Sequence, residues 1–188
     1  MKLLLASNSP RRIELMSNAG FDFETVPSGI DEGPPASEEA PEHYARRIAR
    51  VKALSVAARS PAGRLVLGAD TIVTIAGVIL GKPAGPSDAI RMLRLLSGHT
   101  HDVVTAICVV RAPEEVLALE HETTSVTFRT LDAQEIEAYV GSGEPFDKAG
   151  AYAIQGLASK FVTRISGCYF NVVGLPVSRL YEMLRTLS

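Results

Sequence analysis

The order of hydrophobic and polar positions predicts helices and strands that alternate along the chain. Runs of apolar and β-branched residues predict strands, and amphipathic spacing such as that of Tyr44, Ile48 and Leu54 predicts helices. The predicted strands cover residues 2–6, 21–26, 64–75, 78–83, 100–112, 115–131 and 160–167. The predicted helices cover residues 10–19, 41–58, 87–96, 133–140 and 176–187. With no internal repeat, this alternation is typical of the α/β class, with a mixed twisted sheet flanked by helices.

Capping residues and loops mark the ends of these elements. Ser9 is a good N-cap, and Pro10 follows at the first helical position, where its missing N–H costs nothing. Asp132 and Glu135 form a capping box for the fourth predicted helix. The polar segment 27–41, rich in Pro and Gly, and the glycine-punctuated segment 141–156 are predicted loops.

Composition places the chain among ordinary globular proteins. It has 188 residues, of which 46% are hydrophobic and 21% charged, and this predicts one domain over residues 1–188. The formal net charge of -2 argues against a nucleic-acid-binding surface, because such surfaces carry an excess of Lys and Arg. A local cationic pocket for a small anion is compatible with that charge.

Cysteine usage and hydropathy predict a cytoplasmic protein. Cys108 and Cys168 show no metal or disulfide spacing, which favours a compartment that keeps thiols reduced, and Cys108 reads as a core residue. The first twelve residues faintly resemble a signal peptide, but their apolar run is too short. No apolar stretch approaches membrane-spanning length, so we expect no membrane association.

The turn after the first strand carries groups suited to an anion. Ser7 and Ser9 supply hydroxyls, free amides are expected at the helix N-terminus, and Arg11 and Arg12 supply guanidinium groups that bind phosphate bidentately. The alternative is a capping serine followed by exposed arginines. Lys82, in the tight turn "LGKPAGP", could present a compact charge to a phosphate or could be a solvated surface lysine.

Acidic residues suggest metal or acid–base chemistry. Asp70 interrupts the apolar strand "VLGADTIV", and a buried carboxylate needs a cation, a metal or a strand-end position. It could bind a divalent cation, activate water, or accept hydrogen bonds from turn amides as a structural residue. Asp31 and Glu32 could add oxygen ligands, although loop acids are usually only solvated.

Other candidate groups carry weaker signals. His99 and His101 would face the same side of a strand, as metal ligands can, but a turn and strand-edge position is the better interpretation. Gln155 is an amide in a glycine loop, suited to reading the edge of a base. The sequence has no P-loop, no convincing dinucleotide fingerprint and no nucleophile elbow.

Taken together, several motifs resemble the Maf family of nucleoside triphosphate pyrophosphatases. They occur in the family's order along almost the whole chain: "LASNSPRR", "GADTIV", "LGKP", "LSGHTH", "VTFR", "EPFDKAGAYAIQG" and "NVVGLP". The resemblance implies two lobes around a deep cleft, with a fold similar to inosine triphosphate pyrophosphatase. It also implies hydrolysis of a nucleotide to its monophosphate and pyrophosphate, dependent on Mg²⁺ or Mn²⁺, and it suggests a homodimer.

The resemblance assigns roles to matching residues. Asp70 matches the family's catalytic proton acceptor, and a metal would be held by Asp70 with Glu32. The other polar positions that line the family's cleft are Ser7, Ser9, Arg11, Arg12, Lys52 and Lys82. The branch that prefers dTTP and UTP over 7-methyl-GTP is marked by Arg11, Thr71 and Gln155, all present here.

The resemblance therefore predicts a dTTP and UTP pyrophosphatase with a house-cleaning role against non-standard pyrimidine nucleotides. Ala153 and Cys168 replace a Gly and a Ser that are common in the family, which bears on substrate detail more than on reaction type. Three alternatives stay open at this point. They are a nucleotide-binding regulator of septum formation with little turnover, a phosphatase that releases orthophosphate, and a structural protein without a small-molecule site.

Overall fold

The computed structural model describes residues 2–187, so the two end residues of the predicted domain lie outside it. Seven strands form one hydrogen-bonded sheet in the order β2-β1-β3-β5-β6-β7, with β4 paired to β3. The sheet is mixed, because β1 pairs in parallel with β2 and β3, whereas β4 and β7 pair antiparallel to their neighbours. The strands are β1 Leu3–Leu5, β2 Phe23–Thr25, β3 Leu65–Ile75, β4 Val78–Leu80, β5 Thr100–Arg111, β6 Glu115–Phe128 and β7 Val162–Ser166.

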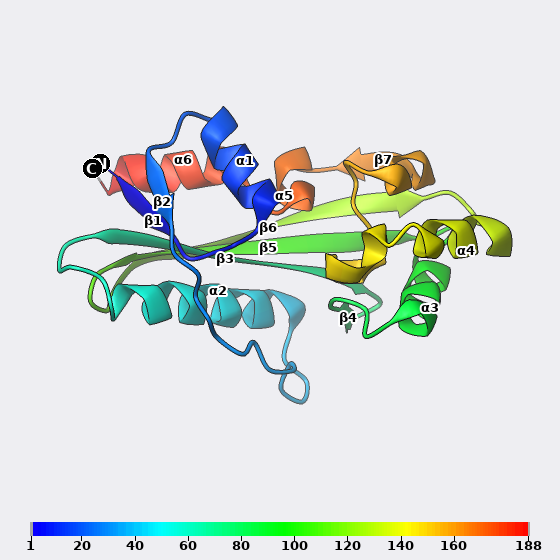
Figure 1. Cartoon of the computed structure of the whole chain (residues 1–188), viewed down its shortest axis with the longest axis horizontal. Helices are drawn as coiled ribbons and strands as arrows, with labels where there is room; N and C mark the ends of the chain where they lie inside the picture. Colours follow the sequence, from blue (N-terminus) through cyan, green and yellow to red (C-terminus); the bar gives the residue numbers. More distant parts are fainter. Residues whose placement is uncertain (1, 188) are drawn as a thin grey trace. The chain divides into compact units, whose positions relative to one another are not determined.

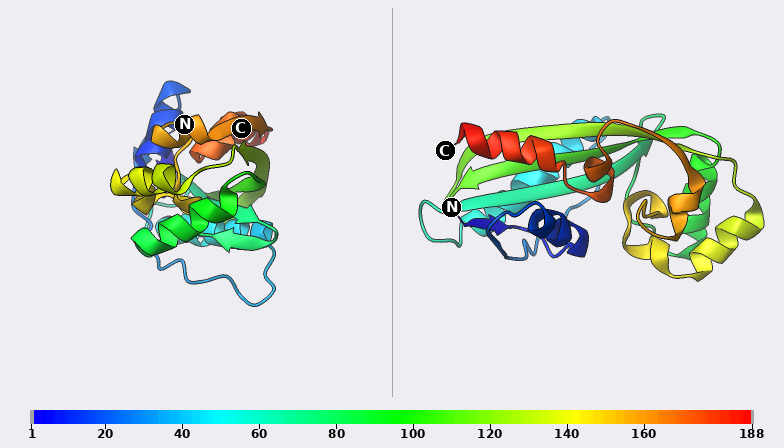
Figure 2. Two further views of the ribbon diagram at one scale, coloured as in Figure 1. Left: turned by 90° about the vertical axis from the view of Figure 1, so that its right-hand side faces the viewer. Right: turned by 90° about the horizontal axis from the view of Figure 1, so that it is seen from above.

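The chain divides into two compact units, and β3, β5 and β6 contribute to both. The first unit comprises, among the described residues, 2–71, 105–122 and 174–187. Its helices are α1 Pro10–Asn18, α2 Pro41–Ala57 and α6 Val177–Thr186. In this unit α2 covers one face of the sheet, and α1 and α6 lie over the other (Figures 1 and 2). The unit is thus a three-layer α/β structure, as the alternation of elements predicts.

The second unit comprises residues 72–104 and 123–173. Two of its helices, α3 and α4, contact each other. An edge-to-face aromatic cluster of His101, Phe128, Tyr152 and Phe161 fills its core. Its helical elements are α3 Pro86–Leu96, α4 Ala133–Gly141, η1 Glu144–Asp147, η2 Ala149–Ala151, η3 Leu157–Phe161 and α5 Tyr169–Val173.

Most predicted elements are confirmed, and the main differences lie in the second half of the chain, where the predicted loop 141–156 contains the 3-10 helices η1 and η2. The predicted strand 160–167 begins at Val162, because residues 157–161 form a 3-10 helix that buries Ala158 and Phe161. Helix α5 was not predicted, because five residues are too few to show a helical period. None of the helices described here is long and apolar enough to cross a bilayer.

The contact between α2 and β3 depends on a glycine. A Cβ atom at Gly68 would lie 2.7 Å from the Ala53 amide nitrogen and 2.9 Å from the Ala53 Cβ, and closer still to the Ala49 carbonyl oxygen. Only a residue without a side chain lets the helix backbone approach the strand this closely.

We therefore expect Gly68→Ala to push α2 away from the sheet. Because backbone atoms oppose the added methyl group, the free energy of unfolding should fall by about 1–3 kcal/mol, as for an overpacked core. Urea unfolding followed by circular dichroism measures this loss. Gly63→Ala is not a suitable control, since Gly63 has a positive φ, whereas Gly81→Ala meets no atom within 4 Å and should leave stability nearly unchanged. Equal stability of the Gly68 and Gly81 variants would contradict this packing.

Candidate active site

The first unit gathers most of the predicted polar residues around the end of β1 and the middle of β3. Asp70 and Thr71 lie on β3, Lys52 lies on α2, and Glu32 lies in the loop 26–40. Ser7 follows β1, and Arg12 lies in the first turn of α1. Strands β1 and β3 are parallel neighbours with Leu5 paired to Leu67, so the turn after β1 lies beside the part of β3 that carries Asp70 and Thr71.

A buried lysine joins the two predicted metal-binding acids. Lys52 Nζ lies 2.7 Å from Asp70 Oδ1 and 2.7 Å from Glu32 Oε1. Lys52 and Asp70 are 8% and 5% exposed, whereas the Glu32 side chain is 46% exposed. Lysine is seldom buried without a partner, and here the partners are the residues whose chemistry the sequence singled out.

Burial raises the pKa of Asp70 above its ordinary value, against the opposing effect of Lys52 and Arg12. Desolvation is the largest cause, so the protein environment disfavours the charged carboxylate even with an ammonium group beside it. A carboxylate whose pKa is raised is a better proton acceptor than an exposed one. This observation supports an acid–base role for Asp70.

The buried Arg12 side chain forms hydrogen bonds to three separate segments of the chain. Its Nε donates to the Gly174 carbonyl at 2.9 Å, its Nη2 to Thr71 Oγ1 at 2.9 Å, and its Nη1 to Ser7 Oγ at 3.4 Å. Burial lowers the pKa of Arg12, and Asp70 partly offsets this. The expectation of two exposed helix arginines is therefore wrong for Arg12, while Arg11 is half-buried.

The two serines have different roles from those that capping alone would give. Ser9 occupies the N-cap position with Pro10 after it, as predicted, but its side chain makes no capping hydrogen bond. Instead the Ser9 amide donates to Ser7 Oγ at 3.1 Å. The Ser7 hydroxyl therefore stabilises the turn by accepting from the Ser9 amide, and it also accepts from Arg12. These two contacts give Ser7 a role that the N-cap residue Ser9 does not fill.

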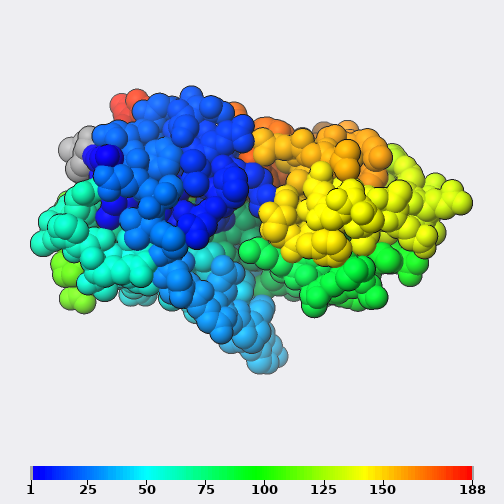
Figure 3. Space-filling model, viewed as in Figure 1, coloured from blue at the N-terminus to red at the C-terminus, as the bar shows by residue number. Residues whose placement is uncertain are grey.

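Sequence reasoning missed three groups that support this cluster. Thr105 Oγ1 lies 2.9 Å from Thr71 Oγ1, and the Gly174 carbonyl accepts from Arg12. A threonine in a β-branched strand carries no signal of such a contact. Tyr44 was predicted only as part of an apolar face, yet its hydroxyl donates to the Gly33 carbonyl at 3.0 Å and so tethers the loop next to Glu32. That loop otherwise projects from the body of its unit (Figure 3).

Lys82 and Gln155 belong to the second unit and are not part of this cluster. Both side chains are exposed. The two histidines do not form a pair: His99 is exposed and precedes β5, whereas His101 is buried with Nε2 2.8 Å from the Tyr152 hydroxyl. Burial lowers the pKa of His101 to about 4. Cys108 is buried, and burial raises its pKa to about 12, which confirms a core thiol.

The donor set suits a hard divalent cation. Mg²⁺ is usually held by one or two carboxylates together with phosphate oxygens and water. Asp70 and Glu32 supply two carboxylates, and since Lys52 Nζ contacts one oxygen of each, a divalent cation would bind through their other oxygens. Residues 2–187 contain no group of three or more His, Cys, Asp and Glu side chains placed to hold a metal, so further ligands would come from substrate and solvent.

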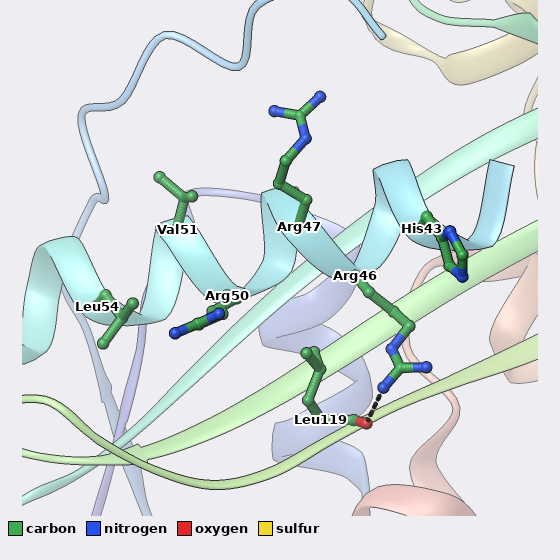
Figure 4. Close-up of a pocket in the computed structure, with 7 residues that line it drawn as sticks. All are labelled: His43, Arg46, Arg47, Arg50, Val51, Leu54 and Leu119. Atoms are coloured by element: carbon green, nitrogen blue, oxygen red, sulfur yellow. Dashed lines mark hydrogen bonds between the residues drawn. The ribbon is translucent and has the colours of Figure 1, made fainter. Parts of the chain in front are cut away.

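A surface pocket of about 500 Å³ lies between α2 and Leu119 of β6. In Figure 4 the guanidinium group of Arg46 reaches the Leu119 carbonyl, to which it donates at 3.2 Å. None of the residues predicted for the active site lines this pocket. Its lining consists of His43, Arg46, Arg47, Arg50, Val51, Leu54 and Leu119.

Comparison with known proteins gives a consistent result. Residues 2–187 match the family model described as Maf-like protein. A protein of Koribacter versatilis is 50% identical over 185 residues, covering 98% of this chain and 94% of the relative. A protein of Salmonella typhimurium is 51% identical over 182 residues, covering 97% and 91%. Both relatives are named dTTP/UTP pyrophosphatase.

Two solved structures share the fold. The Ham1 protein of Staphylococcus aureus aligns over 100% of both chains with a TM-score of 0.56 and 14% identity. A HAM1 protein from Coxiella burnetii aligns over 99% of both chains with a TM-score of 0.53 and 14% identity. At this identity the likeness concerns the fold alone, and it agrees with the α/β arrangement described above.

Proposed function

This chain belongs to the Maf-like protein family, and from that membership we infer that it is a nucleoside triphosphate pyrophosphatase acting on dTTP and UTP. The reaction consumes one water and yields the nucleoside monophosphate and pyrophosphate. The observation that carries the chemistry is the buried Lys52 ammonium, 2.7 Å from both Asp70 and Glu32. A structural protein would have little reason to bury the Lys52 and Asp70 charges, because taking both out of water is costly.

We propose that Asp70 acts on the attacking water. The water oxygen bonds to the α-phosphorus, the bond from that phosphorus to the bridging oxygen breaks, and pyrophosphate leaves with the electron pair. The water proton passes to the Asp70 carboxylate, whose raised pKa favours its acceptance. Lys52 holds the carboxylate in place through the contact at Oδ1.

Cationic groups would position the triphosphate. Arg11 follows the turn formed by Ser7 and Ser9, and Lys82 lies in the exposed turn after β4. Guanidinium and ammonium groups attract the phosphates and favour departure of pyrophosphate. A divalent cation held by Asp70 and Glu32 would supply further neutralisation of the charge that develops on the phosphate oxygens. Arg12, buried and engaged with three partners, is assigned to positioning Ser7 and Thr71.

We further propose that Gln155 reads the pyrimidine edge through its side-chain amide. The side chain is exposed, and it lies in a segment whose backbone is well anchored. The family resemblance also suggests a homodimer, a cytoplasmic location and activity on non-standard pyrimidine nucleotides. These three stay predictions, and size-exclusion chromatography tests the first of them directly.

Product analysis tests the proposed reaction. UTP, dTTP, CTP, GTP and 7-methyl-GTP are incubated with the purified protein, with and without Mg²⁺ or Mn²⁺, and pyrophosphate and orthophosphate are assayed separately. We expect metal-dependent pyrophosphate from UTP and dTTP, with GTP and 7-methyl-GTP slower by at least about tenfold. Orthophosphate as the first product would overturn the assignment in favour of a phosphatase. Nucleotide binding without turnover would favour the regulator instead.

A further inference from the structure

Two side chains fasten the segment 153–157, which carries Gln155, at both ends. The Tyr139 hydroxyl accepts from the Ala153 amide at 3.3 Å, and Glu144 Oε2 accepts from the Leu157 amide at 3.0 Å. The same tyrosine hydroxyl donates to Glu144 Oε1 at 2.9 Å. One carboxylate oxygen of Glu144 thus accepts from Tyr139 on α4, and the other accepts from the first residue of η3.

Gly156 shows how closely the carboxylate packs against this segment. A Cβ atom at position 156 would lie 2.5 Å from Glu144 Cδ and closer still to both carboxylate oxygens. The backbone there has φ -102° and ψ -151°, an extended conformation open to residues with side chains. Backbone conformation therefore does not demand glycine here, but any side chain at position 156 would have to displace the Glu144 carboxyl group.

The surroundings of Tyr139 keep its hydroxyl neutral, as its hydrogen bonds to Glu144 and Ala153 require. It is 3% exposed, and its ring packs edge-to-face on Phe161 with centroids 5.3 Å apart. Burial, followed by the hydrogen bond to Glu144, raises the pKa of its hydroxyl. The hydroxyl therefore remains a donor to Glu144 and an acceptor from Ala153 over the working pH range.

We propose that Glu144 is a positioning residue for nucleobase selection, acting through Gln155. It fixes the backbone on the C-terminal side of Gln155 and, through Tyr139, on the N-terminal side, so that the exposed amide extends from a backbone held in one position. A hydrogen-bonding group that is held in place discriminates between bases, whereas a mobile one adapts to several. The inference rests on the proposed function, because it needs Gln155 to face the base.

The test compares nucleotides with a substrate that has no base. We expect both Gln155→Ala and Glu144→Ala to lower the ratio of kcat/KM for UTP over GTP by about tenfold. Hydrolysis of methyl triphosphate, which offers the same phosphates without a base, should stay within about twofold of the wild type. Glu144→Gln should restore the ratio to within about threefold, since its amide can accept from Leu157 and donate to the Tyr139 hydroxyl.

Gly156 supplies an independent check through a double-mutant cycle. Gly156→Ala alone should reduce selectivity, because its methyl group displaces the carboxylate. In the Glu144→Ala background the same change should have little further effect, since the obstacle is gone. Additive effects would overturn the proposed contact.

The outcomes separate this proposal from the proposed function. Unchanged UTP preference in Gln155→Ala would refute base reading by Gln155, and the positioning role of Glu144 with it. A loss of preference in Gln155→Ala but not in Glu144→Ala would refute the positioning role alone. Equal losses on UTP and methyl triphosphate would show a general structural effect and would also refute it. Should Glu144→Ala fail to fold, Tyr139→Phe, which releases the Ala153 amide, must show a smaller loss of the same kind.

Discussion

Asp70→Asn is expected to abolish pyrophosphate release from UTP and dTTP while making the protein more stable. The amide cannot accept the water proton, so kcat should fall by at least about a thousandfold, the upper part of the range for a lost general base. Because burial is the main cause of the raised pKa, the ionised carboxylate destabilises the folded state at neutral pH. Asparagine removes that charge.

The stability gain should depend on pH in a defined direction. The folded-state pKa of Asp70 lies above the unfolded value, so the folded protein binds the proton more tightly and its stability falls as pH rises through that window. At pH 7 the variant should melt a few degrees higher than the wild type, about 2–4 °C for each 1 kcal/mol. Below the unfolded pKa both states are protonated, and the difference should vanish.

Calorimetry from pH 3.5 to 8, paired with the pyrophosphate assay, measures both effects. Asp22→Asn, at an exposed position, is the matched control and should change neither activity nor melting temperature. A variant that keeps near-normal turnover would remove Asp70 from the chemistry. A variant that is less stable than the wild type at pH 7 would mean that the contact with Lys52 outweighs desolvation.

Arg12→Ala is expected to have the largest effect on stability. It leaves the Gly174 carbonyl and the hydroxyls of Ser7 and Thr71 without a charged donor in a buried place, so the free energy of unfolding should fall by about 3 kcal/mol. For a chain of this size that corresponds to a melting temperature lower by roughly 6–12 °C. Arg12→Lys should recover little of the loss, because one ammonium group cannot reproduce the planar fork that reaches three acceptors.

Differential scanning fluorimetry of these variants, with Arg94→Ala as the control, gives the comparison. Arg94 is an exposed arginine on α3, so its removal should leave the melting temperature unchanged. Full stability in Arg12→Lys would contradict a role that depends on guanidinium geometry. Activity should fall in both Arg12 variants through displacement of Ser7 and Thr71, even at temperatures where they remain folded.

The sequence predicted the fold class well because its signals are local. The cap and proline at the start of α1 and the capping box of α4 mark helix ends wherever the rest of the chain lies. Asp70 stood out because a carboxylate in an apolar strand requires an explanation within a few residues. The family resemblance added Lys52 as a candidate beside Glu32. In the structure Lys52 contacts Asp70 directly, and Glu32 contacts Lys52.

What could not be predicted depends on contacts between distant positions. The sequence left Arg12 open between an anion-binding group and an exposed arginine, because nothing near it shows that Gly174 and Thr71 will surround it. The capping role of Ser9 failed for a similar reason: Ser7 accepts the Ser9 amide instead, since Arg12 holds that hydroxyl in place. Glu144 and Gly156 belong to one quoted motif, yet their mutual fit depends on how a loop closes on itself.

The division of the chain has a consequence for biosynthesis. The first unit is assembled from three separate stretches, and the last of them, residues 174–187, carries α6 and the carbonyl that accepts from Arg12, 162 positions earlier. Helix α1, which carries Arg12, therefore leaves the ribosome long before the Gly174 carbonyl has been synthesised. Such long-range pairing slows folding. Until residue 174 is synthesised, the Arg12 guanidinium lacks this acceptor and the core of the first unit is incomplete. Nascent chains arrested before residue 174 should accordingly be sensitive to protease throughout the first unit, even though more than nine-tenths of the protein has been made.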